Sequence, residues 1–330
     1  MNDAISIGRI GALLLLGALL PGCLPEDPRP TPGSLLTTMS GSPATQNGFS
    51  TEDGWNISFE RVLVSAGPMQ LDDEGCDKSR EYSEPGYGRI LDVMRPGAQK
   101  LSIIYGLGKC AGVDFEVSNP NKDALVLGSG VSEADRTFML TPGTDRYSEN
   151  EGVTLHVEGT AVNGLQTLSF VWDFRRSIFY KECSVPIDGI PEKGVDLEGG
   201  VQVNFDLVIK AEAFFRDDVK VETRKLRFAP FAEADARGNG DSFVELDELA
   251  NVSLDELRST APYGIGHGRT NYPIAGPSFP INTLEDYVYI VLLGRGSFED
   301  DGVPEDPGFS HETFLGFRDT GTCKVGFNEP

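Results

Sequence analysis

Positive charge is scarce in this sequence. Its 330 residues include 28 Lys and Arg against 51 Asp and Glu, which gives a formal net charge of −23 at pH 7. A nucleic-acid-binding surface needs Lys and Arg to displace the counterions of the phosphates, so the composition argues against a nucleic-acid partner. It also argues against electrostatic docking on anionic lipid. Divalent cations and basic partners stay compatible with such a surface.

Sequence signatures of catalysis are missing as well. The histidines are His156, His267 and His311, and none belongs to an HExxH motif; no GxSxG elbow and no P-loop lysine occurs. We expect His156 on the polar side of a strand, solvated or hydrogen-bonded at the surface. His267 lies in the glycine-rich stretch 264–268, which reads as a loop. A carboxylate-based hydrolase stays open as an alternative, because that chemistry depends on spacing in three dimensions.

Cysteine is rare, and no two cysteines have the CxxC spacing of a zinc knuckle or a thioredoxin-type site. Apart from Cys23, the chain contains Cys76, Cys110, Cys183 and Cys323. An even number in an exported protein predicts two disulfides, with three possible connectivities. The pairing that we prefer is Cys76–Cys110 and Cys183–Cys323.

Long hydrophobic runs are limited to residues 10–20 near the N-terminus. As a helix this run would rise about 16 Å, which is too short to cross a hydrocarbon core of roughly 30 Å. It therefore predicts the apolar part of a secretory signal peptide, residues 1–22, and not a lasting membrane span.

The apolar run ends in Leu20-Pro21-Gly22-Cys23. This tetrad resembles the lipobox of bacterial lipoproteins, although Pro21 stands where a small Ala, Ser or Thr is usual. The resemblance implies that Cys23 carries acyl chains such as palmitate, becomes the new N-terminus and anchors the protein to the cell envelope. Leu24 is not the Asp that signals retention in the inner membrane, which favours the outer membrane. The alternatives are an ordinary secretory signal cut nearby, or a core helix with a chance cysteine.

Residues 23–50 are rich in Pro, Ser, Thr and Gly and poor in apolar residues. Such a segment buries too little surface to offset its ordering entropy. We therefore expect the lipidated cysteine to be followed by a flexible tether that ends near residue 50.

Alternation of apolar and polar residues dominates the chain from residue 51 to residue 228. Trp55, Ile57 and Phe59 alternate with polar residues, and a phase slip before Val62 predicts a bulge. Further strands are expected at 100–106, 153–157, 168–174 and 201–211. No alternation of strands and helices is present, so the sequence predicts an antiparallel β-sandwich over 51–228.

Helical signals concentrate in residues 229–330. Helical turns are expected at 245–251 and again after Ser253, and a capped segment opens at Asn282. The β-branched residues within 288–291 leave a strand possible there. The predicted fold class is therefore mainly β: an antiparallel β-sandwich with a C-terminal helix and loop segment packed on it.

The segment from Asp235 to Glu248 resembles the calcium loop of an EF-hand, in which oxygens at alternating positions and a terminal bidentate Glu hold the ion. Two registers fit. One runs from Arg237 to Glu248 without insertion. The other starts at Asp235 and puts Gly240 at the tight turn, but it needs two extra residues before Glu248.

We prefer the register without insertion, in which the Phe243 carbonyl and five side chains would supply oxygens. Those candidate ligands are Asp235, Asn239, Asp241, Glu245 and Glu248. Arg237 occupies the first position, where a guanidinium offers no acceptor, and Ser242 replaces the usual glycine. The loop is therefore a candidate for weak calcium binding. In the alternative, Arg237 pairs with the loop carboxylates and replaces the ion.

Aromatic residues could line a carbohydrate- or peptide-binding face. Trp172 and Phe174 share their parity with Leu168 and Phe170, so we expect them in the core instead. Phe214 and Phe215 are adjacent at the end of an expected strand, where only one of the two rings can point inward.

These features together predict a lipid-anchored binding or scaffolding protein of the cell envelope. Its partners would be the membrane, through the N-terminal lipid, and an envelope protein or glycan that the sequence does not identify. The alternative is the secreted hydrolase with a carboxylate-based active site.

Overall fold

The computed structural model describes most of the chain after residue 30. The described residues are 31–71, 88–110, 112–128, 130–146, 148–164, 166–183, 185–187, 190–192, 195–197, 199–217, 225–260, 271–272, 279–280, 282–293, 315–317 and 324–326. Contacts group Thr31–Pro330 into one compact unit. The predicted signal peptide, Cys23, Cys76, His267 and Cys323 lie outside the described residues.

The smaller of the two main sheets has four strands in the order β21-β17-β1-β5. Its strands are β1 (Gly33–Gly41), β5 (Gln99–Gly106), β17 (Gln202–Ile209) and β21 (Leu315–Phe317). β1 pairs in parallel with β17 and antiparallel with β5.

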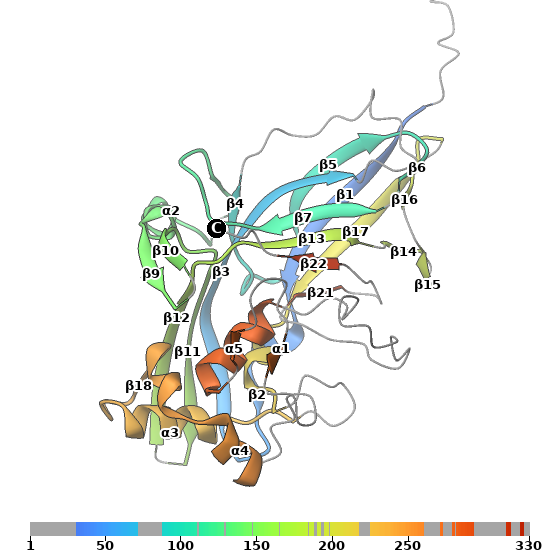
Figure 1. Ribbon diagram of the computed structural model, residues 1–330. Coiled ribbons are helices and arrows are strands. Elements are labelled where there is room, and N and C mark those ends of the chain that lie inside the picture. The colour runs from blue at the N-terminus through green and yellow to red at the C-terminus, as the bar shows by residue number, and fades with distance from the viewer. Residues whose placement is uncertain are drawn as a thin grey trace, which may run out of the picture. The chain divides into compact units, whose positions relative to one another are not determined.

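The larger sheet has ten strands, and its main path is β18-β12-β11-β3-β7-β13-β22 (Figure 1). Its strands are β2 (Phe49–Ser50), β3 (Asn56–Leu71), β4 (Arg89–Asp92), β7 (Val113–Val117), β8 (Leu125–Val126), β11 (Leu155–Asn163), β12 (Gln166–Phe174), β13 (Ile178–Cys183), β18 (Phe243–Glu245) and β22 (Lys324–Gly326). Two-stranded ribbons are β6 (Lys109–Cys110) with β16 (Val195–Asp196), β9 (Gly143–Asp145) with β10 (Ser148–Glu151), β14 (Val185–Ile187) with β15 (Ile190–Glu192), and β19 (Asn271–Tyr272) with β20 (Phe279–Pro280). Most pairs are antiparallel; the parallel ones are β1–β17, β4–β8 and β12–β18.

Helices are short, and four of the seven in the described part of the chain begin after residue 228. They are α1 (Pro43–Asn47), α2 (Glu133–Leu140), α3 (Ala229–Arg237), α4 (Leu254–Thr260) and α5 (Leu284–Leu293), with 3-10 helices η2 (Ala211–Phe215) and η3 (Asp247–Asn251). The predicted mainly-β class with a C-terminal helical segment is confirmed. The strand alternative at 288–291 is wrong, because Thr283 and Asp286 cap the start of α5 through reciprocal hydrogen bonds. Within the described part of the chain, no helix combines the length and the apolar character needed to cross a membrane.

The hydrophobic core lies between the two main sheets. Phe115 of β7 meets Phe205 of β17 edge to face, with ring centroids 6.0 Å apart. The Ser102 hydroxyl of β5 donates to the Met69 sulfur of β3 at 3.4 Å. Trp172 and Phe174 are fully buried in this core, which confirms that they pack inside and do not line a binding face.

The predicted bulge in β3 is present at Glu60. Arg61 lies opposite Glu158, and Phe59 lies opposite Gly159, so Glu60 has no residue facing it on β11. The extra residue shifts the inward parity of β3, which is why Phe59 and Val62 both point into the core.

The prediction of a tether that extends to residue 50 is wrong. Residues from Gly33 form β1, which pairs on both sides, and α1 and β2 follow. Leu35, Thr37 and Met39 alternate inward and are fully buried. The segment is ordered because neighbouring strands satisfy its backbone and its small β-branched residues suit a pleated surface.

The prediction that only one ring of the 214–215 pair points inward is also wrong. Phe214 and Phe215 are both fully buried. β17 ends at Ile209, and the pair belongs to η2 instead of a strand. Consecutive side chains on a 3-10 turn diverge by about a third of a turn, so two neighbours can both face apolar surroundings.

A second, smaller core covers part of the outer face of the larger sheet. It consists of Leu63, Ile90, Ala124, Val131, Met139 and Val153. α2 contributes Met139 to this core. The ring centroid of Phe138, also on α2, lies 5.1 Å from that of His156. His156 is on the predicted side of β11, but it is buried under α2 and pairs with Asp173, with 2.7 Å between Nδ1 and Oδ1.

Cys110 and Cys183 are both fully buried and disulfide-bonded. The strand β22 begins directly after Cys323 and pairs with β13, with Lys324 opposite Lys181. The pairing Cys76–Cys110 and Cys183–Cys323 stays a prediction, because two of the four cysteines lie outside the described residues.

Candidate functional site

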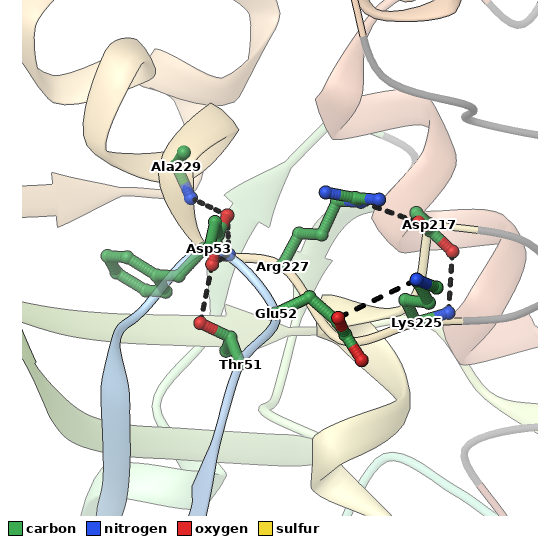
Figure 2. Close-up of polar contacts among 8 residues, drawn as sticks. Thr51, Glu52, Asp53, Asp217, Lys225, Arg227 and Ala229 are labelled. Atoms are coloured by element: carbon green, nitrogen blue, oxygen red, sulfur yellow. Dashed lines mark hydrogen bonds and ion pairs between the residues drawn. The ribbon is translucent and has the colours of Figure 1, made fainter.

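The candidate calcium loop belongs to a segment that we call the helical module, residues 229–260, which comprises α3, β18, η3 and α4. The module begins at α3, where a helix leaves its first backbone N–H groups without partners. Asp53, in the turn before β3, accepts hydrogen bonds from the Phe228 and Ala229 N–H groups at 2.9 and 2.8 Å (Figure 2). A carboxylate at a helix N-terminus also complements the helix dipole. Asp53 therefore fixes the start of α3 on the sandwich.

The segment that leads into α3 is held by Asp217, which is almost fully buried. Its carboxylate accepts from the Lys225 backbone N–H at 2.7 Å and from Arg227 Nε at 2.6 Å (Figure 2). The Lys225 ammonium and the Glu52 carboxylate lie 3.6 Å apart and are both exposed, so this pair contributes little. Asp217 therefore holds the segment before the module in place, and Asp53 holds the first turn of α3.

After α3 the chain makes a tight turn and joins the sheet. The Gly240 N–H donates to the Asp235 carbonyl at 2.9 Å, and Gly240 and Ser242 both have positive φ. β18 then pairs in parallel with β12 at the edge of the larger sheet. The Trp172 indole N–H donates to the Val244 carbonyl at 3.1 Å and ties this short strand to the core.

The order helix, loop, short strand and helix is the one that the EF-hand resemblance implies. η3 replaces most of the helix expected over 245–251, and Glu245 ends β18. Positive φ at both Gly240 and Ser242 means that the turn geometry suits either register. Asp235 is buried and its Oδ1 accepts from the Ser242 N–H at 3.1 Å, so it faces the loop.

Backbone N–H groups donate to side-chain oxygens of three other candidate ligands, Asn239, Asp241 and Glu248. Glu248 is buried, and its two oxygens accept from the Asn239 and Glu245 N–H groups at 3.0 and 3.1 Å. The Asn239 side-chain oxygen accepts from the Asp241 N–H, and the Asp241 carboxylate accepts from the Phe243 N–H. Glu248 therefore joins the two ends of the loop, and the loop keeps its shape through its own hydrogen bonds.

The loop is strongly negative. Glu245 is exposed, and partial desolvation is the first cause of its raised pKa; the nearby carboxylates of Asp247, Glu248 and Asp241 raise that pKa further. The oxygen-rich donor set is of the type that calcium prefers. In the arrangement described, however, no three side chains of His, Cys, Asp or Glu converge on a point where a metal ion could sit; this holds for the residues that the structure describes.

Arg237 does not neutralise the loop, so that alternative is wrong. Its guanidinium pairs with Glu233 at 2.5 Å and with Glu256 at 2.7 Å, both outside the loop. The hydrogen bonds from Arg237 are the first cause of a lowered pKa at Glu256. Arg237 thus links α3 to α4 and leaves the loop carboxylates with their negative charge.

No protein-family model matches this chain, and neither a curated protein nor a solved structure shows significant similarity to it. The functional argument therefore rests on the residues and their geometry.

Proposed function

We propose that this chain is a lipid-anchored binding or scaffolding protein of the cell envelope, attached through Cys23 and presenting the helical module to a partner. The observation that carries the proposal is the course of β3. β3 begins at Asn56, next to the turn in which Asp53 caps the module. It ends at Leu71, whose side chain lies against Gly106, where a Cβ would come within 2.8 Å of Leu71 Cδ1.

Gly106 pairs with Gly33, the first residue of β1 and the one nearest to Cys23 in the sequence. The 16 residues of β3 rise at most about 50 Å, at roughly 3.3 Å per residue. One strand therefore separates the start of the folded body from the helical module. This arrangement supports a protein that is held at one end and binds at the other.

Two further features support the proposal. Disulfide-bonded Cys110 and Cys183 suit an oxidising compartment outside the cytoplasm. A rigid sandwich with loops and short helices at its end is a common way to present a recognition surface. The partner class that we propose is an envelope protein or a glycan.

Lipid attachment is tested with the full chain, expressed with its N-terminal signal in a bacterium that has two membranes and supplied with radiolabelled palmitate. We expect the wild-type chain to carry the label and to sediment with the outer membrane. Cys23→Ala should lose the label and stay in the soluble fraction, whereas Leu24→Ala, a neighbouring change, should keep both properties. Leu24→Asp should move the protein to the inner membrane. An unlabelled wild-type chain would contradict the proposal.

The binding role is tested with the unlipidated Cys23→Ala chain as bait for detergent-solubilised envelope components. We expect a component that is retained by this bait but not by the same bait with charge reversals at exposed positions of the module, such as Glu233→Lys together with Asp255→Lys. A set of retained components that is the same for both baits would contradict the module as the binding surface.

A calcium-stabilised loop is a second candidate, favoured by the uncompensated carboxylates around Glu245. Calcium at about ten times its Kd should stabilise the native state by about 1.4 kcal/mol and raise Tm by about 2 °C relative to EDTA. Glu248→Gln should abolish the rise. Asp247→Asn removes the same charge at a neighbouring position that is not a candidate ligand, so it should keep the rise. The absence of any shift in the wild-type chain at 10 mM calcium, about ten times the Kd of the weakest natural sites, would rule out this candidate.

A further inference from the structure

Two exposed apolar side chains lie beside the start of β1. Tyr105 and Val201 have exposed fractions of 44% and 54%. Tyr105 is paired with Ser34 in the sheet, and the Ser34 N–H donates to the Val201 carbonyl at 2.8 Å. The other large apolar side chains that are exposed in the described part of the chain are Leu125, Phe138 and Val162, which belong to β8, α2 and β11. We call the region of residues 31–34, 104–109 and 195–202 the anchor end.

Backbone hydrogen bonds hold the three segments of the anchor end together. Gly33 donates its N–H to the Leu197 carbonyl, and Leu197 donates its N–H to the Gly108 carbonyl. Figure 1 shows the start of β1 beside β6 and β16. The backbone segments that carry the exposed tyrosine and valine thus meet where the described chain begins.

The chain between Cys23 and this surface is short. Gly33 is ten positions after Cys23, and a fully extended chain of ten steps spans at most roughly 33–36 Å. The tether is much shorter than the sequence predicted, because β1 begins at Gly33 and not near residue 50. An acylated Cys23 therefore holds the anchor end within a few nanometres of the lipid.

Charge does not oppose close approach at this surface. Among the described residues of the anchor end, the side chains charged at neutral pH are Lys109 and Asp196, and these two are opposite each other in the β6–β16 pair. Glu198 falls in the same range but outside the described residues. The described side chains of the anchor end therefore carry no net charge.

We propose that the anchor end is a membrane-contacting surface, in which Tyr105 and Val201 enter the boundary between headgroups and acyl chains. Tyrosine is favoured there because its ring is apolar while its hydroxyl reaches water. The partner is the lipid surface that holds Cys23, so the inference rests on the proposed lipid attachment. It adds a fixed orientation, with the module directed away from the membrane.

The test places an indole at the surface of the full lipidated chain and measures its quenching by brominated lipid in vesicles. Tyr105→Trp and Val201→Trp are two independent reporters at the anchor end. Val162→Trp is the matched control, because Val162 is exposed and pairs with Asn56, at the module end of β3. The native Trp55 and Trp172 are buried and give a constant background.

We expect the indoles at positions 105 and 201 to lose about half of their emission, since side chains at this depth reach 5–10 Å into the interface, whereas the indole at position 162 keeps its emission. Flotation of the same vesicles reports the anchor separately. Flotation with equal or no quenching at all three positions overturns this inference and leaves the lipid anchor intact. A chain that does not float overturns both.

Discussion

Replacing Arg146 with methionine is expected to lower the free energy of unfolding by about 3–5 kcal/mol. Arg146 lies between β9 and β10 and pairs with both acidic residues at the start of α5, with 2.8 Å between its Nη2 and the Asp286 Oδ1. The Glu285 and Asp286 side chains are only 8% and 2% exposed. Burial already raises the pKa of Glu285, and Arg146 opposes that rise. Without Arg146, two adjacent carboxylates would stay buried with much less compensation.

Urea unfolding of the wild-type and Arg146→Met chains measures this loss as a lower midpoint with an unchanged slope. Lys225→Met is the control, because Lys225 and Glu52 form an exposed pair whose removal should cost less than about 1 kcal/mol. Adding Glu285→Gln to Arg146→Met should restore part of the stability. A loss no larger than that of the control would mean that the pair is as weak as a surface salt bridge.

Replacing Trp172 with alanine is expected to cost about 3–5 kcal/mol, the usual range for a buried Trp or Phe reduced to Ala. The ring is fully buried and contacts four phenyl rings. Those rings belong to Phe170, Phe214, Phe215 and Phe231. Phe231 lies on α3, so the cavity would open between the sheet and the helical module.

Trp172→Phe separates packing from hydrogen bonding at this position. It keeps most of the ring but removes the donor to the Val244 carbonyl, and the loss of one buried hydrogen bond should cost about 1–3 kcal/mol. Hydrogen exchange should show faster exchange in β18 for both variants. Exchange that is unchanged in β18 would contradict the link from Trp172 to the loop.

Strands with strict alternation could be predicted from the sequence, because one buried face imposes a period of two. β12 is such a strand, and the phase slip that marks the bulge at Glu60 was visible in the same way. β1 was missed because serine, threonine and glycine gave it the composition of a linker. Leu35, Thr37 and Met39 do alternate inward. An alternating pattern of three residues with a threonine in the middle is a weaker signal for a strand than the linker-like composition is for a tether.

The candidate loop could be located from sequence, since its residues are contiguous. The residues that hold this loop on the sandwich could not be predicted, because they are distant from it in the sequence. Asp53 caps a helix that begins at Ala229, and Trp172 holds β18 from a neighbouring strand. His156 was placed on the correct face of β11, but the covering α2 is a tertiary feature that no local pattern reports.

The course of β3 has a mechanical consequence. If a partner pulls on the helical module while the lipid holds the other end, the tension runs along this strand. Its ladder to β11 and β7 is antiparallel, with hydrogen bonds perpendicular to the strand direction. Such a pull shears many bonds at once instead of peeling them one after another, so the sheet is built to resist extension along that line.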